Sequence, residues 1–218
     1  MDSLYRLTCG PINNARDTTI DETIIILQQP YKEIRDDGVR YLSDILRNNI
    51  TLITLDVGTN KIGPKGAQYL ADALFQNTTL TILNISSNKI EADGAQNIAV
   101  ALRSNTTLTK LNISNNIIGD IGTQHLADAL RNNNTLAILD LWNCRIRDDG
   151  AQYLADALRN NTTLKVLDLT LNYITSNGAI HFDAVLRSNK TLIKLDMSNN
   201  QISWLRKHIL WKDSRILF

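Results

Sequence analysis

A period of 28 residues runs through most of the chain and constrains its fold more than any other feature. Each copy opens with a leucine, carries a second leucine three residues later and has an aliphatic residue two positions after that. The opening residues are Leu52, Leu80, Leu108, Leu136, Leu164 and Leu192, with Ile24 in an earlier, divergent copy. Six full periods cover residues 24–191 and a seventh ends near Ser203, so we expect an array of stacked repeats.

The hydrophobic period changes within each copy. In "LTILNIS" at residues 80–86 the apolar residues alternate, which predicts a strand with one buried face. Further along, Ala95, Ile98, Ala99 and Leu102 stand at i, i+3, i+4 and i+7, which predicts an amphipathic helix. One strand and one helix cannot bury enough apolar surface to fold alone. The copies must therefore stack into a solenoid, with one strand from each of seven copies.

The pattern L-x-x-L-x-L-x-x-N-x-I, followed by G-A-x-x-L-A-x-A-L, resembles the leucine-rich repeat of the ribonuclease-inhibitor type. The C-terminal arrays of NOD-like receptors share this subtype, and the resemblance covers about residues 24–203. It implies an α/β leucine-rich-repeat solenoid, a right-handed horseshoe with parallel strands on the concave face and helices on the convex face. Residues 1–23 are then expected to form an N-terminal cap, and residues 204–218 a C-terminal cap or degenerate repeat.

The ninth position of each copy is expected to turn the chain from strand to helix through a side chain that bonds backbone groups. The residues at this position are Asn60, Asn88, Asn116, Cys144, Asn172 and Asn200. The general repeat pattern accepts either asparagine or cysteine there. Nothing near Cys144 in the sequence would lower the pKa of its thiol, so we interpret it as a structural cysteine.

Residues that flank the buried leucines are predicted to face the concave surface. Trp142 stands there among serines and threonines, which is typical of a binding hot spot, although a tryptophan can also simply cover neighbouring strands. Asp140, Asp168 and Asp196 share one frame position, on strands expected about 4.8 Å apart. A basic partner surface would relieve the repulsion within this row; the alternative is that the row only keeps the solenoid soluble.

Other residues of the same face complete the predicted site. Asn112 has the frame position of the aspartates, and Ile138 and Val166 form an apolar track beside them. The predicted partner-binding residues are Trp142, Asp140, Asp168, Asp196, Asn112, Ile138 and Val166.

No catalytic, cofactor or metal site is predicted. The stretch "GTNKIGPKG" at 58–66 resembles a phosphate-binding loop only superficially, because Pro64 follows its second glycine. The three histidines stand singly, without a spaced metal ligand or nucleophile. The net charge is +1 with no uninterrupted basic run, and no 18 apolar residues run together, so we expect neither nucleic acid nor a membrane as partner.

These features favour a non-enzymatic scaffold that binds a protein through its concave face, and we expect a cytoplasmic monomer. The first twenty residues lack an apolar stretch of signal-peptide length, and two cysteines do not make a disulfide framework. Several N-x-S/T triplets, including those at Asn77, Asn105, Asn161 and Asn189, arise from the join between repeats and are expected to stay unmodified.

Three alternatives share this repeat: a ribonuclease inhibitor, a sensor fragment of the NOD-like-receptor type and a Ran GTPase-activating regulator. Such inhibitors are strongly acidic and cysteine-rich, whereas this chain has a net charge of +1 and two cysteines. No nucleotide-binding domain precedes the repeats in this sequence. The Ran regulators carry an acidic C-terminal tail, whereas this tail is basic and aromatic.

Overall fold

The computed structural model describes residues 6–7, 26–28, 30–203 and 213–218. Its strands are β1 (Arg6–Leu7), β2 (Ile26–Gln28), β3 (Thr54–Asp56), β4 (Ile82–Asn84), β5 (Lys110–Asn112), β6 (Ile138–Asp140), β7 (Val166–Asp168), β8 (Lys194–Asp196) and β9 (Ile216–Leu217). Its helices are α1 (Asp36–Asn48), α2 (Pro64–Gln76), α3 (Ala92–Leu102), α4 (Gly119–Leu130), α5 (Asp148–Leu158) and α6 (Ser176–Ser188). Most of the predicted N-terminal cap (1–23), and residues 204–212 of the predicted C-terminal cap or degenerate repeat, lie outside the described residues.

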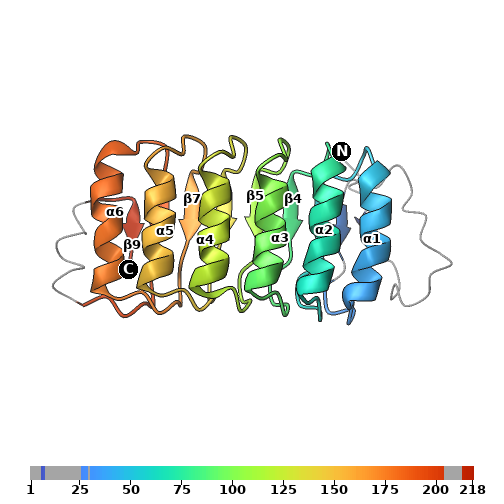
Figure 1. Cartoon of the computed structure of the whole chain (residues 1–218), viewed down its shortest axis with the longest axis horizontal. Helices are drawn as coiled ribbons and strands as arrows, with labels where there is room; N and C mark the ends of the chain where they lie inside the picture. The colour runs from blue at the N-terminus through green and yellow to red at the C-terminus, as the bar shows by residue number, and fades with distance from the viewer. Residues whose placement is uncertain (1–5, 8–25, 29, 204–212) are drawn as a thin grey trace.

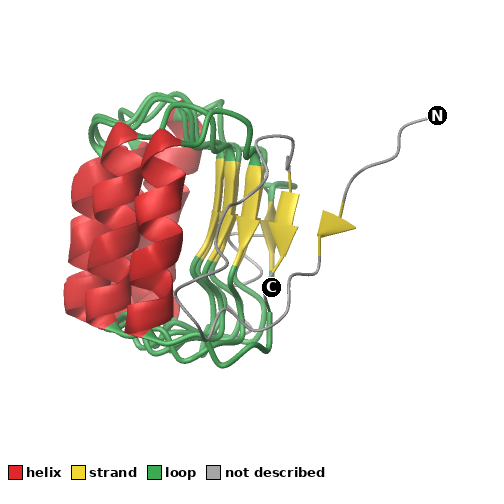
Figure 2. Ribbon diagram, turned by 90° about the vertical axis from the view of Figure 1, so that its right-hand side faces the viewer, coloured by secondary structure: helices red, strands yellow, loops and turns green. Residues whose placement is uncertain are grey.

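The strands form one parallel sheet of nine strands in sequence order. From β2 to β8 each residue pairs with the residue 28 positions later, so that Leu55 lies beside Leu83 and Leu83 beside Leu111. The helices stand in one row, and the sheet lies on one side of that row (Figures 1 and 2). The predicted leucine-rich-repeat solenoid is confirmed, and its sheet is two strands longer than the seven repeats require, through β1 and β9.

The space between the two layers is filled by the aliphatic side chains of the repeat. Leu83 and Ile85 from the strand side meet Ile98 and Leu102 from the helix side, and all four are at most 1% exposed. Burial of each such side chain contributes about 1.5–3 kcal/mol. Glycine in the first turn allows the helices to lie close together: a Cβ on Gly178 would come within 2.9 Å of the Asp148 Cα atom.

Two rows of asparagines, most of them buried, join each repeat to the one before it. In the first row, at the ninth position, the Asn116 Nδ2 atom donates to the carbonyls of Ile113 and Ser114 in its own turn and of Ile85 in the preceding repeat. Its Oδ1 atom accepts the Ile90 N–H at 3.0 Å. Asn88 and Asn172 make equivalent bonds. The row therefore satisfies backbone groups that the turns leave unpaired in the interior.

The second row lies at the end of each helix and consists of Asn77, Asn105, Asn133, Asn161 and Asn189, all buried. In Asn105, for example, Nδ2 donates to the carbonyls of Leu74 and Asn77 in the preceding repeat. Its Oδ1 atom accepts the N–H groups of Thr107 and Leu108, which start the next strand segment. The asparagine of the N-x-S/T triplet is thus a structural bridge between repeats.

Cys144 replaces asparagine in the first row, and the turn beside it is rearranged. The Sγ atom lies 3.5 Å from the Ile113 carbonyl and 3.6 Å from the Trp142 carbonyl. In the other repeats the asparagine Oδ1 atom also accepts a backbone N–H from the preceding repeat, and a thiol is a poor acceptor for such a bond. Instead the Gly119 N–H donates to the Cys144 carbonyl, Gly119 has φ +62°, and α4 begins at Gly119. Burial raises the pKa of the Cys144 thiol to about 12, so it remains protonated.

At the C-terminal end, Arg215 takes the place of the next helix-end asparagine. Its guanidinium group donates to the carbonyls of Leu186, Asn189 and Leu192 and pairs with Asp213. The carbonyls of Leu186 and Asn189 are the two that a further asparagine of the row would bind. With β9 pairing to β8, these contacts close the end of the described array.

The two residue types of the ninth position give a first prediction. Cys144→Asn is expected to change the free energy of unfolding by less than about 1 kcal/mol, because the turn can use either side chain. Asn116→Leu is expected to lower it by about 1–3 kcal/mol, since four backbone groups lose a partner. Urea denaturation measures both values. A large loss for Cys144→Asn with none for Asn116→Leu would contradict these roles.

Candidate functional site

The structure brings six of the seven predicted binding residues together on one face of the sheet. Asn112, Asp140, Asp168 and Asp196 end strands β5 to β8 and pair in register, and Ile138 pairs with Val166 at the strand starts. All six are partly exposed, whereas the residues between them in each strand, such as Leu139 and Leu167, are buried. Trp142, the seventh, follows Asp140 by two residues at the end of β6.

The Asp/Asn row has a structural role that the sequence analysis missed. Each of its residues accepts a hydrogen bond at Oδ1 from the backbone N–H two residues later, at 2.8–3.1 Å. These residues are Asp56, Asn84, Asn112, Asp140, Asp168 and Asp196. The side chain therefore ends the strand locally, as Asx turns do. The signal was present in the sequence: the six copies that open at Leu52 to Leu192 all have aspartate or asparagine there, and only the first copy, with Gln28, departs from this.

The charge along the row is less uniform than the three like charges that were predicted. Burial raises the pKa of Asp140 and the charge of Asp168 adds to this effect, while the Trp142 N–H and Lys110 oppose it. For Asp196, burial would raise the pKa, but hydrogen bonds from Ser198 and Lys194 outweigh it and the pKa is lowered. The Lys194 Nζ atom lies 3.4 Å from Asp196 Oδ2. Of the three predicted aspartates, Asp140 and Asp168 thus lie in strands without a lysine, whereas Asp196 shares its strand with Lys194.

Trp142 occupies a position at which neighbouring repeats have Ser86, Ser114, Thr170 and Ser198. Its backbone is fixed by two hydrogen bonds, one to Asp140 Oδ1 and one from the Asn115 N–H. The residue is 36% exposed, so it partly covers neighbouring groups and partly faces solvent. This exposure fits either sequence-based interpretation of Trp142, and its role in binding stays a prediction.

Two further apolar residues are exposed beside Trp142. Leu171 is 43% exposed and Tyr173 is 46% exposed, in the loop that follows β7. Neither is among the predicted binding residues. Their signal in the sequence is the same as that of Trp142, since most other repeats have polar residues at both positions.

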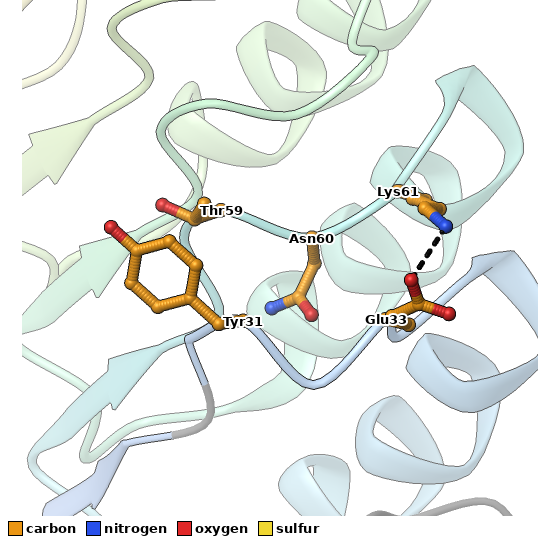
Figure 3. Close-up of a pocket in the computed structure, with 5 residues that line it drawn as sticks. All are labelled: Tyr31, Glu33, Thr59, Asn60 and Lys61. Carbon is orange, nitrogen blue, oxygen red and sulfur yellow. Dashed lines mark hydrogen bonds and ion pairs between the residues drawn. The ribbon is translucent and has the colours of Figure 1, made fainter.

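A surface cavity of about 270 Å³ lies near β2 and β3, lined by Tyr31, Glu33, Thr59, Asn60 and Lys61 (Figure 3). The Lys61 Nζ atom donates to Glu33 Oε1 at 2.8 Å, and this bond lowers the pKa of Glu33. None of the predicted partner-binding residues lines this cavity; Asn60 belongs to the ninth-position row.

The described residues contain no cluster of three or more histidine, cysteine, aspartate or glutamate side chains that could hold a metal ion. Within the same part of the chain, no helix is both long and apolar enough to cross a membrane.

Comparison with known families finds a sequence model described as Leucine Rich repeat, which matches residues 48–71, 76–99, 104–127, 132–155, 160–182 and 188–203. No curated protein matches the chain. A solved structure titled "Leiomodin-1 Actin-Binding Site 2 (ABS2)" is similar with a TM-score of 0.57 and 24% identity, covering 65% of this chain and 82% of that one. The C-terminal domain of tropomodulin from Caenorhabditis elegans is similar with a TM-score of 0.50 and 14% identity, covering 59% and 77%. At these identities the likeness shows a shared fold.

The raised pKa of Asp140 gives a pH-dependent prediction. In the variant Asp140→Asn, the amide oxygen can still accept the Trp142 N–H, just as Asn84 and Asn112 accept the N–H two residues later. The substitution removes only the negative charge. When the pKa of a carboxyl group is higher in the folded state than in the unfolded state, ionisation of that group destabilises the fold. The protein therefore loses stability as the pH rises from the unfolded-state pKa, about 3.9, through the folded-state pKa. Asp140→Asn should therefore melt above the wild type at pH 7, and the difference should vanish below about pH 3.

The matched control is Asn112→Asp, which adds a charge beside Asp140 in the same row. It should melt below the wild type at pH 7 and approach it in acid. Thermal melts across this pH range measure both effects. An Asp140→Asn variant that is less stable than the wild type at pH 7 would show that the carboxylate is favourable where it lies.

Proposed function

We propose that this chain, which belongs to the leucine-rich repeat family, is a non-enzymatic scaffold that binds a partner protein through the concave face of its sheet. The observation that carries the proposal is the partly exposed Trp142. It lies two residues beyond the end of strand β6, and hydrogen bonds of its backbone hold it in place. A large aromatic side chain on a rigid frame is a typical anchor of a protein interface, because little conformational entropy is lost when it is buried.

The size of the face supports a protein partner. The seven strands β2–β8 span about 30 Å at a spacing of about 4.8 Å, which is enough for a patch of about 800 Å². Trp142 stands toward the middle of this span, with Ile138 and Val166 on one side and the aspartates beside it. An apolar centre with a polar surround is the usual anatomy of an interface.

Charge supports a basic surface on the partner. Asp140 and Asp168 each use Oδ1 for their own turn, so that the second oxygen of each carboxyl group is available to a lysine or arginine. Such a cation would also relieve the repulsion between the two carboxylates. Charges of this kind mainly accelerate association, and their effect weakens as salt increases.

The family comparison supports a binding role without naming the partner. The similar leiomodin-1 structure is described as an actin-binding site, so the shared fold can present a surface to a protein. We assign the repeats to the ribonuclease-inhibitor type on their motif. Of the alternative activities, Ran GTPase activation would raise the rate of GTP hydrolysis, whereas ribonuclease inhibition would lower the rate of RNA cleavage. A GTPase assay with and without the chain tests the first of these alternatives.

The tryptophan gives the main prediction. Trp142→Ser restores the residue type of Ser114 and Ser198, whose hydroxyl groups donate to the row of aspartates and asparagines. The variant should therefore fold with a melting temperature close to that of the wild type. Its binding to a protein captured by the wild-type chain from a lysate should weaken about thirtyfold or more, which corresponds to about 2 kcal/mol.

The matched control for this prediction is Phe75→Ala, which removes an exposed aromatic side chain from helix α2. Binding should be unchanged, because the helices lie on the opposite layer from the sheet. Titration of each variant against the captured protein gives the comparison. Equal binding by Trp142→Ser and the wild type would mean that the partner uses another surface.

We further propose that the protein acts as a monomer in the cytoplasm. The buried helix-end asparagines support this location, because both protons of each Nδ2 atom already serve backbone carbonyls and an attached glycan would break the bridge. Expressed in a eukaryotic host without an added signal, the chain should keep its unmodified mass of 24.5 kDa. A heavier product that an N-glycosidase returns to this mass would contradict the proposal.

A further inference from the structure

The eighth position of each repeat requires a left-handed backbone. Seven residues there have φ between +51° and +58°: Tyr31, Thr59, Ser87, Asn115, Asn143, Leu171 and Asn199. Asparagine tolerates this conformation best among residues other than glycine, whereas bulky apolar residues are strongly disfavoured. Leu171, like the bulky Tyr31 and the β-branched Thr59, is therefore held in a backbone conformation that its residue type does not favour; unlike them, it adjoins the asparagines and Trp142.

The polar members of this row also bond to one another. The Asn143 Nδ2 atom donates to Asn115 Oδ1 at 2.7 Å, and Asn115 Nδ2 donates to the Ser87 hydroxyl at 3.0 Å. Leu171 interrupts the run between Asn143 and Asn199 and exposes an apolar side chain. An asparagine at 171 would serve backbone geometry, hydrogen bonding and solubility better. Such an outlier points to a role outside folding.

Leu171 lies in one cluster with Trp142 and Tyr173, and we call these three residues the rim patch. The Asn143 N–H, next to Trp142, donates to the Thr170 carbonyl, next to Leu171, at 2.9 Å. The Tyr173 N–H donates to the Ile146 carbonyl at 2.7 Å, so the two loops run side by side. All three residues are at least 36% exposed, and they stand on two loops that hydrogen bonds hold side by side.

The charges around the rim patch are of opposite sign on its two sides. Asp140 and Asp168 end the strands that lead into it. Arg145 and Arg147, both exposed, follow it in the loop after β6. A ligand that covers the patch would meet carboxylates on the strand side and guanidinium groups on the loop side.

We propose that the rim patch receives a bulky apolar side chain of a partner protein, with a lysine or arginine of the same segment facing Asp140 and Asp168. This inference rests on the proposed function and extends its site from the strands to the loop edge. Leu171 would offer apolar contact to the partner, but its positive φ destabilises the fold. Replacing it should therefore weaken binding and raise stability. A residue kept only for folding would not show this combination of effects.

The test uses the full chain and a phage-displayed library of random 12-residue peptides as the probe. Peptides selected on the wild type should carry a large apolar residue near lysine or arginine. Leu171→Asn should weaken their binding at least tenfold while raising the melting temperature by about 2–4 °C. The control is Ile50→Thr, which removes an apolar side chain that is 77% exposed at the opposite ends of the strands and should leave binding unchanged.

Each outcome separates the rim patch from the wider proposal. Peptides that depend on Trp142 but bind Leu171→Asn as well as the wild type would refute the rim patch and leave the concave-face function standing. Peptides that depend on neither residue would count against both. Failure to select any peptide that prefers the wild type to Leu171→Asn would overturn the rim patch, as would selected peptides that lack both a large apolar residue and a lysine or arginine.

Discussion

The rest of the structure depends on one interaction, the hydrogen bonding of a buried asparagine side chain across two consecutive repeats. An amide has two donor protons and an acceptor oxygen, so that a single residue can satisfy carbonyls in two repeats and N–H groups at the same time. One row stands in the turns after the strands, and the second at the helix ends. Because these asparagines bond backbone groups of the preceding repeat as well as of their own, the interior turns are stable only within the array.

This bridging also explains why the concave face can vary. The asparagines and leucines fix the backbone, and the residues that point away from the core carry little of the folding energy. Serine and tryptophan can therefore occupy equivalent places at 114 and 142, and asparagine and leucine at 143 and 171. Exposed ion pairs on the helices, such as Arg159 with Asp156 at 3.1 Å, add little to stability. The residues proposed to recognise a partner, Trp142 and Leu171, are both departures from the repeat.

Most of the fold could be predicted because the period never slips, and a fixed period determines both the register and the facing of every side chain. The grouping of Asp140, Asp168 and Val166 on one face followed from the same frame. The ends could not be predicted, since Arg215 replaces an asparagine two positions out of frame. Two further features could not be predicted from the sequence, because they depend on backbone and side-chain geometry. They are the positive φ of Leu171 and the ion pair between Lys194 and Asp196.

The central claim is that a partner protein docks on the concave face at Trp142, and site-specific photo-crosslinking tests it most directly. A photoreactive phenylalanine analogue would replace Trp142 in one variant and Val100, 53% exposed on α3, in another. If the partner docks at Trp142, position 142 should give a discrete crosslinked protein and position 100 should give none. Crosslinking from position 100 alone would contradict the account and move the binding surface to the helices.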